Sequence, residues 1–429
     1  MKVLVVGGGG REHAIVRKLK QSPHCTEIWA APGNGGIAFD ATCKNLAATN
    51  VDAQVIFAKE EQFDYVVVAP DDPLALGMVD KLAEAGIPAF GPTAAAARIE
   101  SSKVFSKNLM KKYGIPTAEY EVFTEADKAM DYIRAKGEYP VVIKADGLAL
   151  GKGVLICEDE QQAHKALQEM LEEKAFGESG SRVVVEEFLT GPEVSVLAFA
   201  DGKTLKPMVS SMDHKRALNN DKGLNTGGMG TIVPNPFYTP EIAQVCMETI
   251  FKPTMQAMAA EGCPFKGCLY FGLMLTPKGP RVIEYNCRFG DPETQVVLPL
   301  LEGDLLEIMQ ACTNGTLDRV DVTFKPEHAA CVVLASGGYP QSYEKGKVIH
   351  GLENGQLADG TAIVYHAGTA QQEHRLVTSG GRVLGVTATA PTLEQAVEHA
   401  YAASEKISFE KLHKRTDIGS RALHALKGE

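Results

Sequence analysis

Short apolar runs separated by helical stretches dominate the first hundred residues. The runs at 3–6, 27–30 and 66–69 are each followed closely by Gly or Pro. Apolar runs of this length indicate strands buried on both faces of a parallel sheet. We therefore predict a doubly wound α/β domain that binds its ligand beyond the carboxyl ends of the strands. The prolines of 88–92 mark the end of this region.

The middle of the chain has a less regular pattern, which predicts an α+β region with antiparallel sheets. Helices are expected over 103–113 and 159–173, and strands over 141–144, 154–157, 182–186, 193–200, 269–275 and 281–286.

The last hundred residues predict strands at 329–335 and 383–390, followed by an amphipathic helix. Its apolar positions recur with a 3.6-residue period from Leu393 to Tyr401. The fold class expected is a mixed α/β and α+β multidomain protein. The expected domains are 1–103, 104–315 with a small lobe at about 120–190, and 325–429.

Composition narrows the class of protein. The chain has 429 residues, of which 45% are apolar and 23% charged, as in globular proteins of several domains. The net charge of −11 argues against general binding to nucleic acid. Nine scattered cysteines indicate reduced thiols, and no run approaches the roughly 18 apolar residues of a membrane span. We expect a cytoplasmic protein that contacts neither nucleic acid nor membrane.

A glycine turn follows the first strand. Gly9, Gly10 and Arg11 open the next helix, and backbone N–H groups at a helix start bind anions. A dinucleotide fits poorly, because Glu12 occupies the position of the third fingerprint glycine. A substrate phosphate near Arg11, or a turn without a ligand, are the remaining interpretations.

A second glycine-rich segment, 145–153, joins two predicted strands. Gly153 stands where a Walker A loop requires Ser or Thr. A flap that covers phosphates with Gly151, Lys152 and Gly153 is one interpretation, and an exposed hairpin is the other. Lys144 ends an apolar strand, where a buried ammonium needs an anionic partner.

The run from Val183 to Leu189 is a strand that leads into a short linker. Its backbone would suit an adenine edge, and Glu193 would suit the ribose hydroxyls. An ordinary strand with exposed carboxylates is the alternative interpretation.

Glu284 and Asn286 give the strongest indication of a metal site in the sequence. They are two residues apart in a predicted strand, so their side chains share one face. A carboxylate and an amide oxygen together suit magnesium, which also binds substrate phosphates. Arg288 continues the same face, which is therefore too polar to pack into an apolar core.

Taken in order, these motifs resemble those of the ATP-grasp ligases, and within them the phosphoribosylamine–glycine ligase family. The resemblance extends over essentially the whole chain. It rests on Gly-Gly-Arg-Glu-His13, Ala31-Pro-Gly-Asn34, Lys144-Ala-Asp-Gly-Leu148, Gly151-Lys-Gly153, Asp213-His-Lys-Arg216, Asn225-Thr-Gly-Gly-Met-Gly230, Asn286-Cys-Arg-Phe-Gly-Asp-Pro-Glu-Thr-Gln295 and His366-Ala-Gly-Thr369.

The resemblance implies ligation of glycine to 5-phosphoribosylamine with ATP, through a glycyl phosphate, in purine biosynthesis. It implies an N-terminal α/β domain, a two-lobed ATP-grasp region and a C-terminal domain, with Mg²⁺ or Mn²⁺ as the metal. The catalytic residues implied are Lys144, Asp213 and Arg288. Lys103, Lys144, Gly151, Lys152 and Gly153 would contact ATP phosphates, Glu186, Glu187, Phe188 and Leu189 adenine, Glu193 ribose, and Glu284 and Asn286 the metal. Gly9, Gly10, Arg11, Asp71, Asp213, His214, Lys215, Arg288 and Asp291 would bind glycine and the ribonucleotide.

Three positions depart from the family pattern. Asp71 replaces a usual Glu, Leu224 a usual Pro before Asn225, and Phe271 a small residue. Phe271 would narrow a pocket or fill core.

Other functions remain open from the sequence: a different ATP-grasp enzyme of purine metabolism, a nucleotide-binding regulator without turnover, or an oxidoreductase. The sequence leaves the oligomeric state open, with a monomer as one expectation.

Overall fold

The computed structural model describes residues 1–148, 153–173 and 181–428. Its N-terminal domain is a parallel five-stranded sheet in the order β3-β2-β1-β4-β5. Val3 and Val5 of β1 face one apolar core, whereas Leu4 and Val6 face another. Burial on both faces explains the continuous apolar run, and the predicted α/β domain is confirmed. The strands are β1 (Lys2–Gly7), β2 (Glu27–Pro32), β3 (Thr42–Cys43), β4 (Tyr65–Val68) and β5 (Ala89–Phe90), and the helices are α1 (Gly10–Leu19), α2 (Val51–Glu60), α3 (Asp71–Ala75), α4 (Met78–Glu84) and α5 (Ala94–Ser101).

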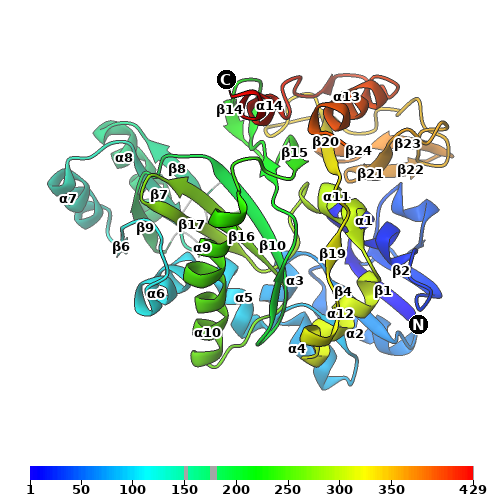
Figure 1. Ribbon diagram of the computed structural model, residues 1–429, viewed down its shortest axis with the longest axis horizontal. Helices are drawn as coiled ribbons and strands as arrows, with labels where there is room; N and C mark the ends of the chain where they lie inside the picture. The colour runs from blue at the N-terminus through cyan, green and yellow to red at the C-terminus, as the bar shows by residue number, and fades with distance from the viewer. Residues whose placement is uncertain (149–152, 174–180, 429) are drawn as a thin grey trace.

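The small lobe lies at the left of Figure 1, away from the chain termini. It is an antiparallel sheet in the order β6-β9-β7-β8, which packs on two helices around its own core. The helix predicted over 159–173 is present as α8 and a π-helical turn, Gln168–Glu172. The elements are α6 (Lys103–Tyr113), β6 (Tyr120–Phe123), α7 (Ala126–Lys136), β7 (Val141–Ala145), β8 (Val154–Cys157), α8 (Glu160–Leu167) and β9 (Val183–Glu187).

The second lobe is built on long antiparallel strands in the order β11-β10-β16-β17. Phe271 of β16 is fully buried, and its ring centroid lies 4.3 Å from that of Phe251. Phe271 therefore fills core rather than narrowing a pocket. The elements of this lobe are β10 (Glu193–Asp201), β11 (Leu205–Pro207), α9 (Pro240–Cys246), a π-helical turn (Met247–Phe251), α10 (Lys252–Ala260), β16 (Lys266–Thr276) and β17 (Gly279–Asn286).

The C-terminal sheet draws strands from two distant parts of the sequence. Its order is β12-β15-β20-β24-β21, with β25 paired to β20. β12 (Met212–Asp213) and β15 (Gly230–Val233) come from the middle of the chain, and Gly230 pairs with Val332 of β20. Asp213 is thus attached to the C-terminal sheet. The other strands are β20 (His328–Ser336), β21 (Ile363–His366), β24 (Arg382–Ala390) and β25 (Leu412–His413).

One further helix, α13 (Leu393–Ser404), packs on β20 and β24 of the C-terminal sheet. Figure 1 shows the N-terminal domain (blue) beside the C-terminal domain (orange), where α1 contacts β21. Within the described ranges, no helix is long and apolar enough to cross a membrane. The other strands and α-helices are β13 (Arg216–Leu218), β14 (Lys222–Asn225), α11 (Thr294–Val297), β18 (Leu301–Glu302), α12 (Leu305–Asn314), β19 (Thr323–Phe324), β22 (Thr369–Gln372), β23 (Arg375–Thr378) and α14 (Ser420–Lys427).

Candidate active site

A cavity of about 1480 Å³ lies where the two lobes, the N-terminal domain and the C-terminal domain meet. Gly9 and Gly10 are absent from its lining, and Gly151 and Lys152 lie outside the described residues. All other predicted site residues line it, namely Arg11, Asp71, Lys103, Lys144, Gly153, Glu186, Glu187, Phe188, Leu189, Glu193, Asp213, His214, Lys215, Glu284, Asn286, Arg288 and Asp291.

Two lysines share one buried carboxylate in the wall of the small lobe. Glu186 Oε2 lies 3.1 Å from Lys144 Nζ and 3.2 Å from Lys107 Nζ. Glu186 thus supplies the anionic partner that a buried Lys144 requires. The other carboxylate oxygen, Oε1, is buried and accepts no hydrogen bond from the described residues, so it is free to accept one from a ligand.

Lys107 was missed by the sequence analysis. Burial lowers its pKa to about 8, although the charge of Glu186 opposes this. It lies four residues after Lys103 on α6, a spacing that places both on one helix face. This spacing in the sequence could have identified Lys107 as a second lysine facing the site. Lys103 Nζ donates to the carbonyl of Gly147 at 2.8 Å, and burial lowers its pKa.

Glu284 and Asn286 lie on β17, and their side chains share one face of the strand because side chains alternate along it. That face lines the cavity. Glu284 Oε1 accepts a hydrogen bond from Lys215 Nζ at 3.4 Å. Burial acts to raise the pKa of Glu284, but the charges of Lys215 and nearby lysines outweigh it and lower the pKa to about 2. The carboxylate is therefore ionised and ready to bind a cation.

The donor set suits a hard divalent ion. It offers an ionised carboxylate and the amide oxygen of Asn286, which accepts a long 3.4 Å hydrogen bond from Arg288. Across the described part of the chain, no group of three or more His, Cys, Asp or Glu side chains is arranged to hold a metal. An ion here would therefore take its other ligands from phosphates and water, as magnesium commonly does.

Arg288 is held by a carboxylate from the N-terminal domain. Glu100 of α5 lies 3.0 Å from Arg288 Nη2, and its other oxygen accepts from the N–H of Cys287 at 2.7 Å. Burial acts to lower the pKa of Arg288, but Glu100 and Asp71 outweigh it and raise the pKa. Glu100 belongs to no motif, so its role could not be predicted from the sequence. Asp71 lines the same cavity, and its charge acts on Arg288.

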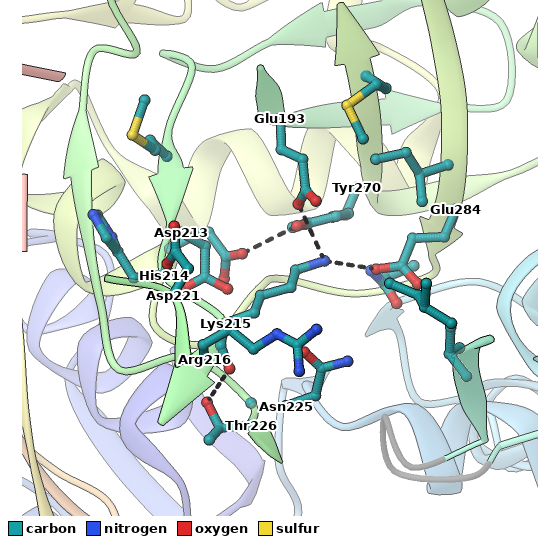
Figure 2. Close-up of a pocket in the computed structure, with 18 of the residues that line it drawn as sticks. Glu193, Asp213, His214, Lys215, Arg216, Asp221, Asn225, Thr226, Tyr270 and Glu284 are labelled. Atoms are coloured by element: carbon teal, nitrogen blue, oxygen red, sulfur yellow. Dashed lines mark hydrogen bonds and ion pairs between the residues drawn. The ribbon is translucent and has the colours of Figure 1, made fainter. Parts of the chain in front are cut away.

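Lys215 extends between two carboxylates of the second lobe, Glu193 of β10 and Glu284 of β17 (Figure 2). Its Nζ lies 3.4 Å from Glu284 and 4.0 Å from Glu193, and the charge of Glu284 raises its pKa. Burial and the charge of Glu293 raise the pKa of Asp213.

His214 makes two internal hydrogen bonds through its ring. Nδ1 donates to the carbonyl of Gly230 at 3.0 Å, and Nε2 accepts from the N–H of Gly419 at 3.1 Å. Burial lowers the pKa of His214 to about 4, so the ring is neutral at pH 7.

Backbone groups of the first glycine turn already have carboxylate partners. The N–H of Gly9 donates to Glu12 at 2.7 Å, and that of Arg11 donates to Asp291 at 3.1 Å. Glu12, which breaks the dinucleotide fingerprint, thus caps its own helix.

Arg382 of β24 is a further cation in the cavity that sequence analysis missed. Its Nη1 donates to the carbonyl of Asp291 at 2.7 Å. It follows Gly380 and Gly381 in a region without a recognised motif, and only the fold brings it to Asp291.

Comparison with known proteins agrees with this geometry. Three family models match in order: the Phosphoribosylglycinamide synthetase N domain at 1–100, its ATP-grasp (A) domain at 101–294 and its C domain at 329–421. The phosphoribosylamine–glycine ligase of Haemophilus influenzae is 47% identical over 99% of each chain, and that of Vibrio vulnificus 46% over 99%.

Solved structures give the same result. A phosphoribosylamine–glycine ligase from Thermotoga maritima superposes with a TM-score of 0.85 and 35% identity, covering 97% of this chain and 100% of that one. The biotin carboxylase domain of a Hydrogenobacter thermophilus 2-oxoglutarate carboxylase shares the fold, with a TM-score of 0.74, 17% identity and coverage of 96% and 91%.

The antiparallel small lobe, facing β17 across a cleft lined with lysines and carboxylates, defines a protein of the ATP-grasp class. Sequence identity over the full length then specifies the group within that class. The chain belongs to the phosphoribosylamine–glycine ligase family.

Proposed function

We propose that this protein ligates glycine to 5-phosphoribosylamine at the expense of ATP, giving glycinamide ribonucleotide, ADP and phosphate in de novo purine biosynthesis. Family membership over 99% of the chain carries this proposal. The cavity supports it, because it offers lysines, a carboxylate–amide pair and further cations at one place.

The nucleotide would lie between the lobes. Lys103 and Lys144 would contact its phosphates, together with the flap segment 151–153. The segment 186–189 would surround the adenine, and Glu193 would accept from the ribose hydroxyls. The free oxygen of Glu186 favours a base with an amino group, since a carboxylate can only accept hydrogen bonds.

Glu284 and Asn286 would hold the divalent ion, Mg²⁺ or Mn²⁺. Bound there, the ion would neutralise charge on the phosphates. On this proposal Arg288, Asp213, His214 and Lys215 bind the glycine and the reacting groups. Arg11, Asp71 and Asp291 would bind the ribonucleotide, whereas a contribution of Gly9 and Gly10, which do not line the cavity, stays a prediction.

Activation of glycine would proceed by attack of its carboxylate on the γ-phosphorus of ATP. The products of that step are glycyl phosphate and ADP. The amine of phosphoribosylamine then attacks the acyl carbon and expels phosphate. Lys144 and Arg288 would stabilise the developing negative charge, which is the main contribution of a protein to such transfers.

Two measurements test this proposal. ADP release should require both glycine and freshly generated phosphoribosylamine, each omitted in turn. Glycine labelled with ¹⁸O in its carboxylate should pass one labelled oxygen to inorganic phosphate in each turnover. Unlabelled phosphate, or label in AMP, would exclude the glycyl phosphate path.

The same proposal extends to cellular context. We place the enzyme in the cytoplasm and expect no nucleic-acid partner. The boundaries 1–103, 104–315 and 325–429 stay predictions, as does the monomeric state.

A further inference from the structure

A β-hairpin next to the cavity is attached to the C-terminal domain. It consists of β13 and β14, and Asn220 and Asp221 at its turn have positive φ angles of 57° and 51°. A two-stranded hairpin is only marginally stable by itself in water. Its position therefore depends on what it packs against.

Arg415 is the central contact of this attachment. Its side chain is 2% exposed, although arginine is rarely buried without partners. Nε and Nη2 donate to the two carboxylate oxygens of Asp417, each at 2.8 Å. Nη1 donates to Asp221 at 3.0 Å and to the carbonyl of Arg216 at 3.1 Å. One planar guanidinium thus joins the C-terminal segment to the start of β13, at Arg216, and to the turn of the hairpin, at Asp221.

Neighbouring residues of the same segment add to the attachment. Asn219 Nδ2 donates to Thr416 Oγ1 at 2.6 Å, and the N–H of Thr416 donates to Asn219 Oδ1 at 2.9 Å. The N–H of Asn220 donates to Asp417 at 2.8 Å. The turn of the hairpin is therefore fixed by side chains and backbone together.

The base of the hairpin leads directly into the site. Lys215 precedes β13, and its carbonyl accepts from both the N–H and the hydroxyl of Thr226, at 2.7 and 2.8 Å. Its Nζ lies between Glu193 and Glu284 (Figure 2). The ammonium of a lysine reaches only as far as its four-carbon stem allows, so the position of the backbone limits where the ammonium can lie.

We propose that Arg415 is a positioning residue of the ligase site, which holds the β13–β14 hairpin so that Lys215 stays between Glu193 and Glu284. Arg415 and Asp417 also line the cavity, and through the hairpin they would contribute to the nucleotide and metal site. This inference rests on the proposed ligase function.

Two variants test the attachment. Arg415→Lys keeps the positive charge but removes the planar guanidinium that bonds to Asp417 and Asp221 at once. Asp221→Asn is a milder variant, since the Asp221 side chain is 60% exposed and Arg415 keeps its pairing with Asp417. Glu373→Gln is the matched control, because Glu373 makes an exposed pair with Arg375 elsewhere in the C-terminal domain. Lys215 would bind glycine and lies between Glu193 and Glu284 of the ATP and metal site. Asp221→Asn should therefore raise the KM values for ATP and for glycine about three- to tenfold, the scale of one hydrogen bond. The KM for phosphoribosylamine and the melting temperature should change little.

Hydrogen exchange gives a readout that does not depend on activity. Amides of 216–226 should exchange faster in both variants, whereas those of β20 and β24 should not. Equal exchange in the hairpin of Asp221→Asn and wild type would overturn the proposal, even if the Arg415 variant fails to fold.

The decisive measurement is a double-mutant cycle with Lys215→Met. If Arg415 acts through Lys215, Asp221→Asn should have no further effect on residual ATP affinity in the Lys215→Met background. Full additivity would overturn the proposal. Absence of ADP release by the wild type would instead refute the ligase function, and the hydrogen-exchange result would still report on the hairpin.

Discussion

Replacing Glu284 by Gln tests the metal site most directly. The substitution keeps the size of the side chain and one oxygen, and it removes the negative charge closest to Lys215, whose Nζ lies 3.4 Å away. Lys144, Lys103 and Arg288 also act on this carboxylate. In the variant these cations face one another without their shared counter-ion.

The structure sets the size of the effect. The pKa of Glu284 is lowered from 4.5 to about 2, which corresponds to roughly 3 kcal/mol in favour of the ionised carboxylate. Because 37% of the side chain is exposed, screening by water reduces this to about 1–2 kcal/mol. The fold should therefore survive. Turnover should fall at least about 100-fold, the scale of losing one key electrostatic group.

The assay is ADP release as a function of magnesium concentration, with glycine and phosphoribosylamine saturating. The variant should need more magnesium, while its affinity for metal-free ATP is unchanged or tighter, because the phosphates meet less negative charge. Glu261→Gln, which alters a surface pair with Lys112, is the control and should behave as wild type. Near-normal turnover of Glu284→Gln at limiting magnesium would remove Glu284 from the metal site.

Two further predictions concern Asp71 and the buried His214. Asp71→Asn should raise the apparent requirement for phosphoribosylamine and leave that for ATP little changed, in steady-state kinetics; an equal effect on ATP would assign Asp71 to domain packing. Burial lowers the pKa of His214 from 6.5 to about 4, so the unfolded chain binds a proton more readily between these values, and stability should fall as the pH is lowered through that window. Urea unfolding should show a smaller decline for His214→Asn, and an equal decline would show that other groups cause it.

The sequence by itself determined the elements that local pattern controls. The apolar run at Val3–Val6 specified a strand buried on both faces, and the structure places it at the centre of the parallel sheet. Glu284 and Asn286 share a face because side chains alternate along any strand, whatever the strand packs against. The order of motifs was sufficient to indicate the family, since it depends on residue identity alone.

Only the tertiary structure decided which distant residues complete the site. Glu100 reaches Arg288, and Arg382 reaches Asp291, across separations that no local period encodes. β12 has two residues and β15 four, too few to show an alternation that predicts their place in the C-terminal sheet. In the sequence, nothing distinguishes Arg415 from other basic residues near the end of the chain. Its role depends on the hairpin turn that the fold brings against it, because burial and pairing are properties of the packed chain and not of the segment.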